Sequence, residues 1–277
     1  MQTAEVDPVL ADVVDHVMTI TLNRPEVGNG WNGAMAHRYF ELLEQAARSQ
    51  EVRAIVLTGS GSAFCVGGDG GALEQAGATG ELASTAKRAY WFPLQIGKPI
   101  IGAINGACFG IGLQQALCCD IRIASSDAKF STAYARRGLV AERGMSWLLP
   151  RLVGTGHAMD MLLSARLVRA DEAARIGLVN RVVSAENMMN EALAYARELV
   201  EKCSPRSMQA VKRQCYQDLM SNMPESYERS EVLLNEAVRQ DDFREGIRSW
   251  QYGRAPTFRS LPEHLALIDF TDAGLST

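Results

Sequence analysis

Two glycine-rich segments decide the fold of this chain. They read Ala63-Phe64-Cys65-Val66-Gly67-Gly68-Asp69-Gly70-Gly71 and Asn105-Gly106-Ala107-Cys108-Phe109-Gly110-Ile111-Gly112. Each follows a compact apolar stretch, residues 54–59 and residues 99–104, that predicts a buried strand. Ligands of open α/β sheets gather at the carboxyl ends of the strands, where glycine lets the backbone approach a ligand closely. We therefore expect both segments to lie beside a binding site.

Neither glycine segment has the spacing of a nucleotide-phosphate loop. Neither is G-x-G-x-x-G, and no lysine follows Gly112. Both segments offer backbone N–H groups, and the second one opens a predicted helix. Two such donors that converge on one point form an oxyanion hole. The alternative is that both segments are tight turns in which glycine serves packing, and the chemistry alone leaves the two interpretations open.

The pattern on both sides of these segments predicts an α/β core followed by a helical region. Strand and helix patterns alternate in the first half, which is typical of parallel β-α units packed in layers. The expected strands cover residues 9–22 (two strands), 54–59, 99–104, 120–124 and 178–183, and the expected helices cover residues 35–47, 82–92, 186–201, 206–220, 228–240 and 243–250. We predict an α/β core domain over residues 1–200 and a helical C-terminal region over residues 201–277.

Composition excludes several classes of protein. The chain has 277 residues, with 28 Lys+Arg against 32 Asp+Glu and a net charge of −4. This balance argues against a partner nucleic acid or membrane surface. The six cysteines form no C-x-x-C pair and the four histidines lie far apart, so we expect no metal site. Buried free thiols and an N-terminus without a targeting pattern lead us to expect a cytoplasmic protein.

Seven matches, in order along the chain and overlapping the two glycine segments, carry a resemblance to a known family. They are residues 20–26 (ITLNRPE), 63–69 (AFCVGGD), 98–106 (KPIIGAING), 119–124 (CDIRIA), 150–154 (PRLVG), 173–179 (AARIGLV) and 242–246 (DFREG). Together they cover about residues 10–258, and the chain resembles the enoyl-CoA hydratase/isomerase (crotonase) superfamily. The resemblance implies stacked β-β-α units in a spiral core, with a C-terminal region that forms trimers. It also implies a homotrimer, or a hexamer built as a dimer of trimers.

The same resemblance implies an acyl-CoA thioester as substrate and no separate cofactor, because coenzyme A is part of the substrate. Family members hold the thioester oxygen with two backbone N–H groups, and by motif position these are those of Gly68 and Ile111. Ile111 stands where glycine is usual, so its β-branched side chain is expected to affect which acyl shapes fit. The neighbouring positions expected to bind substrate are Val66, Asp69, Gly70 and Gly110.

The acid–base residues determine which reaction the resemblance implies. The two glutamates of the family's hydratases fall at Gln114 and Tyr134, which hold no carboxylate and are expected to shape the pocket. Glu142 remains, in a segment similar to that of epoxyphenylacetyl-CoA isomerases. We expect Glu142 to shift a double bond by moving one proton, with a pKa raised by burial among Val140, Met145 and Trp147.

Three alternatives to that role stay open. Glu142 is also placed where an acidic residue favours the start of a helix. The enzyme is alternatively an enoyl-CoA hydratase in which Glu142 alone activates water. A third interpretation, motivated by the loss of both usual glutamates, is an acyl-CoA-binding member without catalytic activity.

Overall fold

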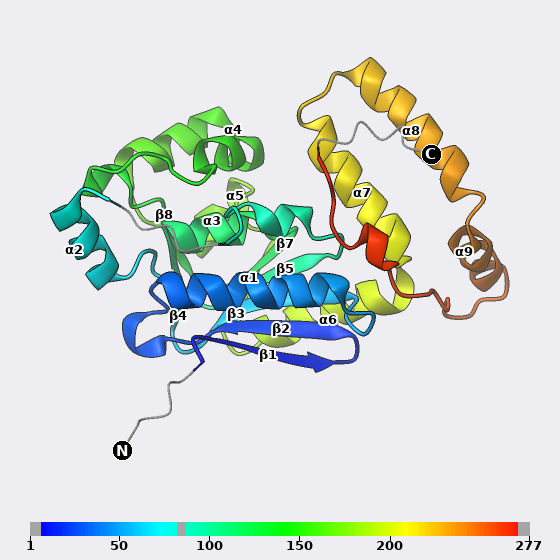
Figure 1. Ribbon diagram of the computed structural model, residues 1–277, viewed down its shortest axis with the longest axis horizontal. Coiled ribbons are helices and arrows are strands. Elements are labelled where there is room, and N and C mark those ends of the chain that lie inside the picture. Colours follow the sequence, from blue (N-terminus) through cyan, green and yellow to red (C-terminus); the bar gives the residue numbers. More distant parts are fainter. Residues whose placement is uncertain (1–6, 82–86, 271–277) are drawn as a thin grey trace.

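Two β-sheets form the core of the protein. The computed structural model describes residues 7–81 and 87–270 (Figure 1). In these residues the larger sheet has the order β1-β2-β3-β5-β7-β10, with bounds Val9–Val14, Val17–Leu22, Ala54–Gly59, Ile100–Ile104, Ile121–Ser125 and Arg181–Val183. The smaller sheet has the order β4-β6-β8-β9, with bounds Ala63–Cys65, Ala107–Phe109, Lys129–Ser131 and Val168–Arg169.

Nine α-helices accompany these strands in the described part of the chain. They are α1 Gly33–Arg48, α2 Gly70–Thr79, α3 Ile111–Leu117, α4 Met145–Ser164, α5 Ala170–Arg175, α6 Met188–Lys202, α7 Pro205–Asp218, α8 Met223–Ala237 and α9 Asp241–Gln251. Figure 1 shows α7, α8 and α9 standing to one side of the two sheets, with α8 and α9 farthest from them.

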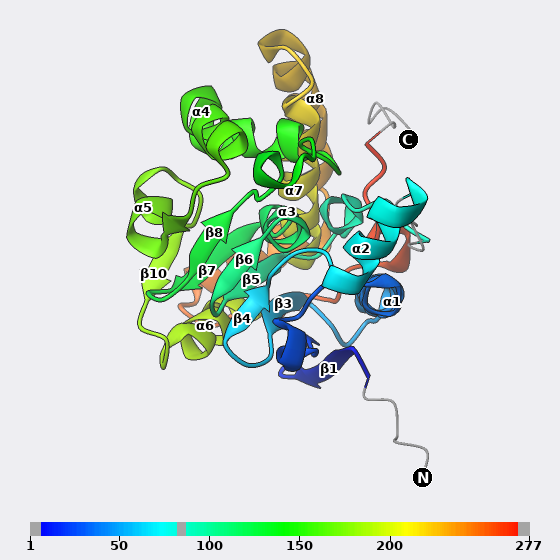
Figure 2. The ribbon, with the colours of Figure 1, turned by 90° about the vertical axis from the view of Figure 1, so that its left-hand side faces the viewer.

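One structural unit repeats three times along the core. Each unit runs from a strand of the larger sheet to a strand of the smaller sheet and then to a helix: β3-β4-α2, β5-β6-α3 and β7-β8-α4. The first strands pair in parallel with one another, and so do the second strands. The predicted stacked β-β-α core with a helical C-terminal region is thereby confirmed (Figure 2).

Both faces of the larger sheet are buried at its central strands β3 and β5, which explains why these two strands are almost entirely apolar. Val56 of β3 and Ile101 of β5 pack against Ala192 and Ala196 of α6. Ile55, on the opposite face of β3, belongs to the main core that α1, α3 and the smaller sheet share. Strands buried on both faces lose the alternation of polar and apolar residues, because neither set of side chains meets water.

A buried ion pair attaches α7 to the core. Lys212 Nζ lies 2.9 Å from Asp120 Oδ2, and its side chain is only 7% exposed. The same carboxylate oxygen accepts the Ile100 N–H, and Tyr216 donates to the other oxygen of Asp120. The first helix of the C-terminal region is therefore joined through Asp120 to Ile100 at the start of β5.

We expect Asp120→Asn to lower the free energy of unfolding by about 2 kcal/mol, because it leaves the buried Lys212 ammonium without a counter-charge. Urea denaturation followed by circular dichroism measures this. Glu198→Gln serves as a control, since its partner Lys202 is 65% exposed and such pairs contribute about 0.5 kcal/mol. Equal effects of the two substitutions would contradict a stabilising role of the buried pair.

The secondary structure predicted from the sequence was wrong for the stretch between the two glycine segments. The prediction placed a helix over residues 82–92, of which residues 82–86 lie outside the described residues and 87–91 form no helix. It missed α2, where a glycine-rich segment forms a helix because the Asp69 carboxylate accepts the Gly71 N–H at its N-terminus. It also missed the strands of the smaller sheet, which have only two or three residues each and show no periodicity.

The cysteines are free, and four of the six are buried, as predicted for most of them. Burial raises the pKa of the Cys65 thiol to about 12. Within residues 7–81 and 87–270, no group of three or more His, Cys, Asp or Glu side chains is placed to hold a metal ion. None of the helices there is long and apolar enough to cross a membrane.

Candidate active site

Three parallel strands of the smaller sheet end at one cavity. Gly67 and Gly68 follow β4, Gly110 and Ile111 follow β6, and Thr132 to Tyr134 follow β8. Because β4, β6 and β8 are neighbours and parallel, their carboxyl ends lie at one edge of the sheet. The predicted convergence of the two glycine segments at a strand edge is therefore confirmed.

Glycine is required where these two segments touch. A Cβ on Gly67 would lie 3.3 Å from the Phe109 carbonyl oxygen, and a Cβ on Gly112 would lie 2.3 Å from the Cys65 carbonyl oxygen. Gly110 has φ 50° and ψ −116°, a combination open essentially to glycine alone. The segments are thus packed backbone to backbone, as the tight-turn interpretation also expected.

Within residues 7–81 and 87–270, the backbone N–H groups of Gly68 and Ile111 have no backbone acceptor. Trp31 N–H donates to the Gly67 carbonyl and Asp69 N–H donates to the Trp31 carbonyl, so this parallel bridge uses the peptide groups on either side of Gly68. Its own N–H points away from Trp31. Ile111 is the first residue of α3, whose N-terminal N–H groups have no partner inside the helix. Both residues line the cavity.

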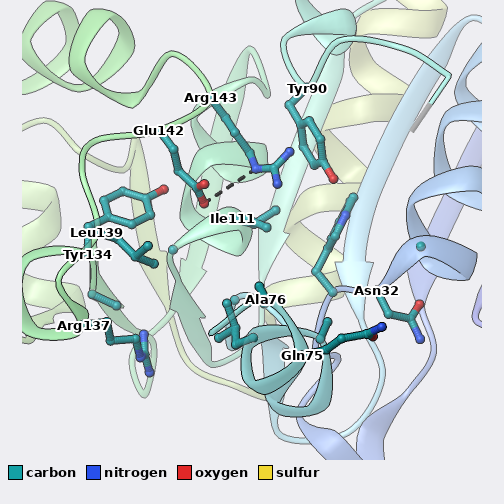
Figure 3. Close-up of a pocket in the computed structure, with 18 of the residues that line it drawn as sticks. Asn32, Gln75, Ala76, Tyr90, Ile111, Tyr134, Arg137, Leu139, Glu142 and Arg143 are labelled. Carbon is teal, nitrogen blue, oxygen red and sulfur yellow. Dashed lines mark ion pairs between the residues drawn. The ribbon is translucent and has the colours of Figure 1, made fainter. Parts of the chain in front are cut away.

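The cavity has a volume of about 260 Å³ and walls from several elements. Figure 3 shows Ile111, Tyr134, Glu142 and Arg143 around its centre and α2 closing it below. The other lining residues are Trp31, Asn32, Gly33, Gly67, Gly68, Ala72, Leu73, Gln75, Ala76, Thr79, Glu81, Tyr90, Gly110, Thr132, Ala133, Arg137 and Leu139. The lining is mainly apolar, with a few polar groups.

Glu142 brings a carboxylate into this cavity, on the loop that precedes α4. Its side chain is 25% exposed, and its Oε1 lies 3.6 Å from Nε of Arg143. The expectation that Val140 buries it was wrong, because the Val140 side chain points to solvent and is 78% exposed. Glu142 does accept the Met145 N–H with its carbonyl at the turn into α4, so it also stands near a helix start.

Tyr134 faces the same region as a neutral phenol. Its side chain is buried, and its Oη has no hydrogen-bond partner among the described residues. Burial, together with the nearby charge of Glu142, raises the pKa of Tyr134 far above its ordinary value. The hydroxyl is therefore a proton-bearing donor near Glu142 and not a base.

Four of the predicted substrate-binding residues do not line the cavity. Gln114 is a fully buried residue of α3, and its Nε2 donates to the Tyr90 carbonyl at 3.3 Å. Val66 packs against Gly28, and Gly70 is exposed at the start of α2. The side chain of Asp69 forms an ion pair with Arg24. None of these four residues lines this cavity, and their contact with substrate stays a prediction.

Asp69 fixes the first glycine segment through an ion pair. Its Oδ2 lies 2.8 Å from Nη1 of Arg24, and this hydrogen bond lowers the pKa of the Asp69 carboxyl below its ordinary value. The same guanidinium nitrogen donates to the Gly30 carbonyl. The segments before α1 and before α2 are thereby joined beside the cavity.

The lowered pKa predicts how Asp69 contributes to stability. A carboxylate whose folded pKa is depressed stabilises the fold above its unfolded pKa, and this is lost as pH falls through the folded pKa. We expect Asp69→Asn, which keeps the cap oxygen, to cost up to about 1 kcal/mol at pH 7. The difference from wild type should vanish at strongly acidic pH in urea titrations. A difference that stays constant with pH would contradict this.

Sequence reasoning missed most of the other lining residues of the cavity, among them Trp31, Tyr90 and Arg143. Trp31 and Tyr90 lie on separate segments, and their rings meet with centroids 6.1 Å apart only in the folded chain. Arg143 places its Cζ 3.7 Å from the centroid of the Tyr90 ring. A signal existed only for Arg143, as a basic residue directly after the predicted glutamate.

Comparison with known proteins agrees with this geometry. The family model described as enoyl-CoA hydratase/isomerase matches residues 13–261. A Rhodobacter capsulatus protein named "Probable enoyl-CoA hydratase" is 37% identical, covering 89% of this chain and 96% of that protein. The 1,2-epoxyphenylacetyl-CoA isomerase of Escherichia coli is 34% identical, covering 90% and 97%. An enoyl-CoA hydratase structure from Bacillus anthracis superposes with a TM-score of 0.85 at 25% identity, covering 91% and 99%.

Proposed function

Because the chain belongs to the enoyl-CoA hydratase/isomerase family and is therefore an acyl-CoA-transforming enzyme, we propose that it shifts a double bond of an enoyl-CoA thioester. The proposal rests on one observation. Glu142 is the carboxylate that reaches the middle of the cavity, beside Ile111 and Tyr134 (Figure 3). Among the described residues only Glu81 also lines it as an acid, and Glu81 is exposed at the end of α2.

The thioester oxygen would be held by two backbone donors. In the proposal it accepts hydrogen bonds from the N–H groups of Gly68 and Ile111, which have no acceptors in the described backbone. Negative charge that develops on this oxygen as the enolate forms would be stabilised by roughly 3 kcal/mol per donor. Because the donors are fixed by packed glycine segments, they need no reorganisation when the charge appears.

Glu142 would carry the proton. Its carboxylate removes a proton from the acyl chain, and the electron pair of that C–H bond enters the enolate. The protonated Glu142 then returns the proton to another carbon of the conjugated system, so that the double bond has moved and the enzyme is restored. The Tyr134 phenol, held neutral by burial, is placed to donate a hydrogen bond to a polar acyl atom.

Water addition is the second candidate, favoured by relatives whose names describe hydratases. In that reaction Glu142 alone would activate water for attack on a 2-enoyl-CoA. Mass spectrometry of a panel of acyl-CoA esters in deuterated water separates the two. Isomerisation incorporates deuterium when the proton on Glu142 exchanges with solvent before it is returned, and it adds no water, whereas hydration adds the mass of one water. Absence of both from every bound ester would favour an acyl-CoA-binding protein without catalysis and would overturn the proposal.

The proposal includes assembly into trimers, or hexamers made of two trimers. Supporting it, α8 buries none of its side chains in the single chain, and α8 and α9 expose large apolar groups. The most exposed of these are Met223, Tyr227, Leu234 and Trp250. Light scattering after size exclusion is expected to give a mass of three or six chains, and a monomer would contradict this. A cytoplasmic location remains part of the same proposal.

A further inference from the structure

A positive charge lies inside the cavity with incomplete compensation. The Arg143 side chain is 13% exposed, and its Nε lies 3.6 Å from Glu142 Oε1, beyond the about 3.2 Å limit of an ordinary N–H···O bond. Nε is buried and has no hydrogen-bond partner among the described residues. One long ion pair compensates a buried guanidinium poorly, and here the Nε–H of Arg143 stays unsatisfied among the described residues.

The fold holds Arg143 there at a conformational cost. Its φ is 54°, in the left-handed region, where a residue with a Cβ is disfavoured by about 1–2 kcal/mol. Glycine would adopt this backbone without strain, and the next residue, Gly144, does so with φ 80°. Strained residues of this kind persist where the surrounding structure over-determines them, and they cluster at functional sites.

Three buried polar atoms of the wall around Arg143 have no hydrogen-bond partner among the described residues. The Tyr90 ring contacts both Trp31 and Arg143, so the three side chains lie in a row along this wall. Trp31 Nε1 and Tyr134 Oη are buried and have no hydrogen-bond partner among the described residues. Buried donors normally find partners, so this wall is built for a ligand that brings acceptor oxygens.

We propose that the acyl group of the substrate carries a carboxylate besides its thioester, and that Arg143 binds this carboxylate. The substrate class is then the CoA monothioesters of dicarboxylic acids. This inference rests on the proposed function, since it takes the cavity as the acyl site. An arginine stacked on an aromatic face keeps its N–H edge available, and that edge matches a carboxylate with two parallel hydrogen bonds.

Charge balance during proton transfer favours a carboxylate over a neutral polar group. When Glu142 accepts the substrate proton it becomes neutral, and Arg143 loses the one carboxylate that faces it among the described residues. A neutral acyl oxygen would satisfy a hydrogen bond and leave the charge unbalanced. A substrate carboxylate keeps the guanidinium compensated before and after the transfer.

Calorimetric binding of two saturated thioesters tests the proposal without turnover. Glutaryl-CoA and pentanoyl-CoA have the same chain length and differ in the terminal carboxylate. We expect the wild-type protein to bind glutaryl-CoA at least tenfold more tightly, and Arg143→Met to bind the two within about twofold. Equal wild-type affinities, or a preference that survives in Arg143→Met, would overturn the proposal.

A matched control and a second variant separate the proposed role of Arg143 from a general effect of charge or folding. Arg137 also lines the cavity but is exposed at its rim, so Arg137→Met removes the same charge and should keep the preference. Arg143→Lys, checked for folding by circular dichroism, keeps the charge without the planar fork. Its preference should fall several-fold, and an unchanged preference would overturn the proposal even if Arg143→Met fails to fold.

Failure of the proposed function gives a different result. Glu142→Gln should still prefer glutaryl-CoA, because it keeps Arg143 and removes a competing carboxylate. In the wild-type protein, α-proton exchange of bound glutaryl-CoA in deuterated water reports on the proton transfer. If exchange is absent but the preference for glutaryl-CoA is retained, the proposed role of Glu142 is overturned and that of Arg143 stands. If exchange occurs without that preference, the proposed role of Arg143 is overturned and that of Glu142 stands.

Discussion

Glu142→Gln is expected to lower the rate of deuterium exchange into a bound enoyl-CoA by about a thousandfold, within the 10²–10⁴ range for a positioned acid–base group. Glutamine has nearly the shape of glutamate but cannot accept and return a proton. The dissociation constant of the thioester should change little, because the backbone donors at Gly68 and Ile111 remain. Mass spectrometry in deuterated water measures the exchange, and calorimetry measures the binding.

Glu81→Gln is the matched control for this prediction. Glu81 lines the same cavity, but it is exposed at the end of α2 and away from the strand ends. The same change of one oxygen to an amide nitrogen should leave the exchange rate within about twofold of wild type. If Glu142→Gln exchanged as fast as Glu81→Gln, the proton would have to be carried by another group and the proposed mechanism would be wrong.

Gly110→Ala is expected to lower kcat by about a hundredfold, which is the size of the loss for one oxyanion-hole donor. A Cβ at this position has room, since its nearest neighbour would be the Gly67 Cα at 3.7 Å. The obstacle is the backbone, because φ 50° with ψ −116° is open essentially to glycine alone. Relief of that strain turns the following peptide, and with it the Ile111 N–H, out of alignment.

Stability and activity separate this effect from ordinary glycine strain. Gly253, beyond α9, also has a positive φ of 61° and open space around it. Gly253→Ala should cost about 1 kcal/mol of unfolding free energy and leave kcat unchanged. Gly110→Ala should show a comparable or larger loss of stability together with the loss of kcat. Full activity in a folded Gly110→Ala variant would exclude a role of the Ile111 N–H in oxyanion binding.

Much of the core could be predicted from the sequence because local pattern and long-range packing agree there. The stretch Ala54–Gly59 is apolar at every position except Thr58, as expected of a strand that is buried on both faces. The structure places this strand, β3, between β2 and β5. Helices α1 and α6 were found within a few residues of their ends, because each has one apolar stripe with helical spacing.

The strands of the smaller sheet could not be predicted from local sequence patterns, for a physical reason. These strands have two or three residues, too few to show a period, and they are stabilised by pairing across 20 or more positions of sequence, as in Cys65 opposite Cys108. The second sheet was expected only from the resemblance to a family, and not from the local pattern of residues. Helix α2 was hidden in the same way, since its glycines argue against a helix and its cap at Asp69 overrides them.

The sequence alone determined which residue types this protein has available for its chemistry. It has two glycine segments after buried strands, no carboxylate at positions 114 and 134, and a carboxylate at Glu142. These are facts about residue type and order along the chain, which need no tertiary structure. Tertiary structure decided which of these groups meet. It directed Asp69 toward Arg24, buried the side chain of Gln114 on α3, and stacked Arg143 on Tyr90 beside Glu142. Side-chain direction depends on packing between distant segments, which no local pattern encodes.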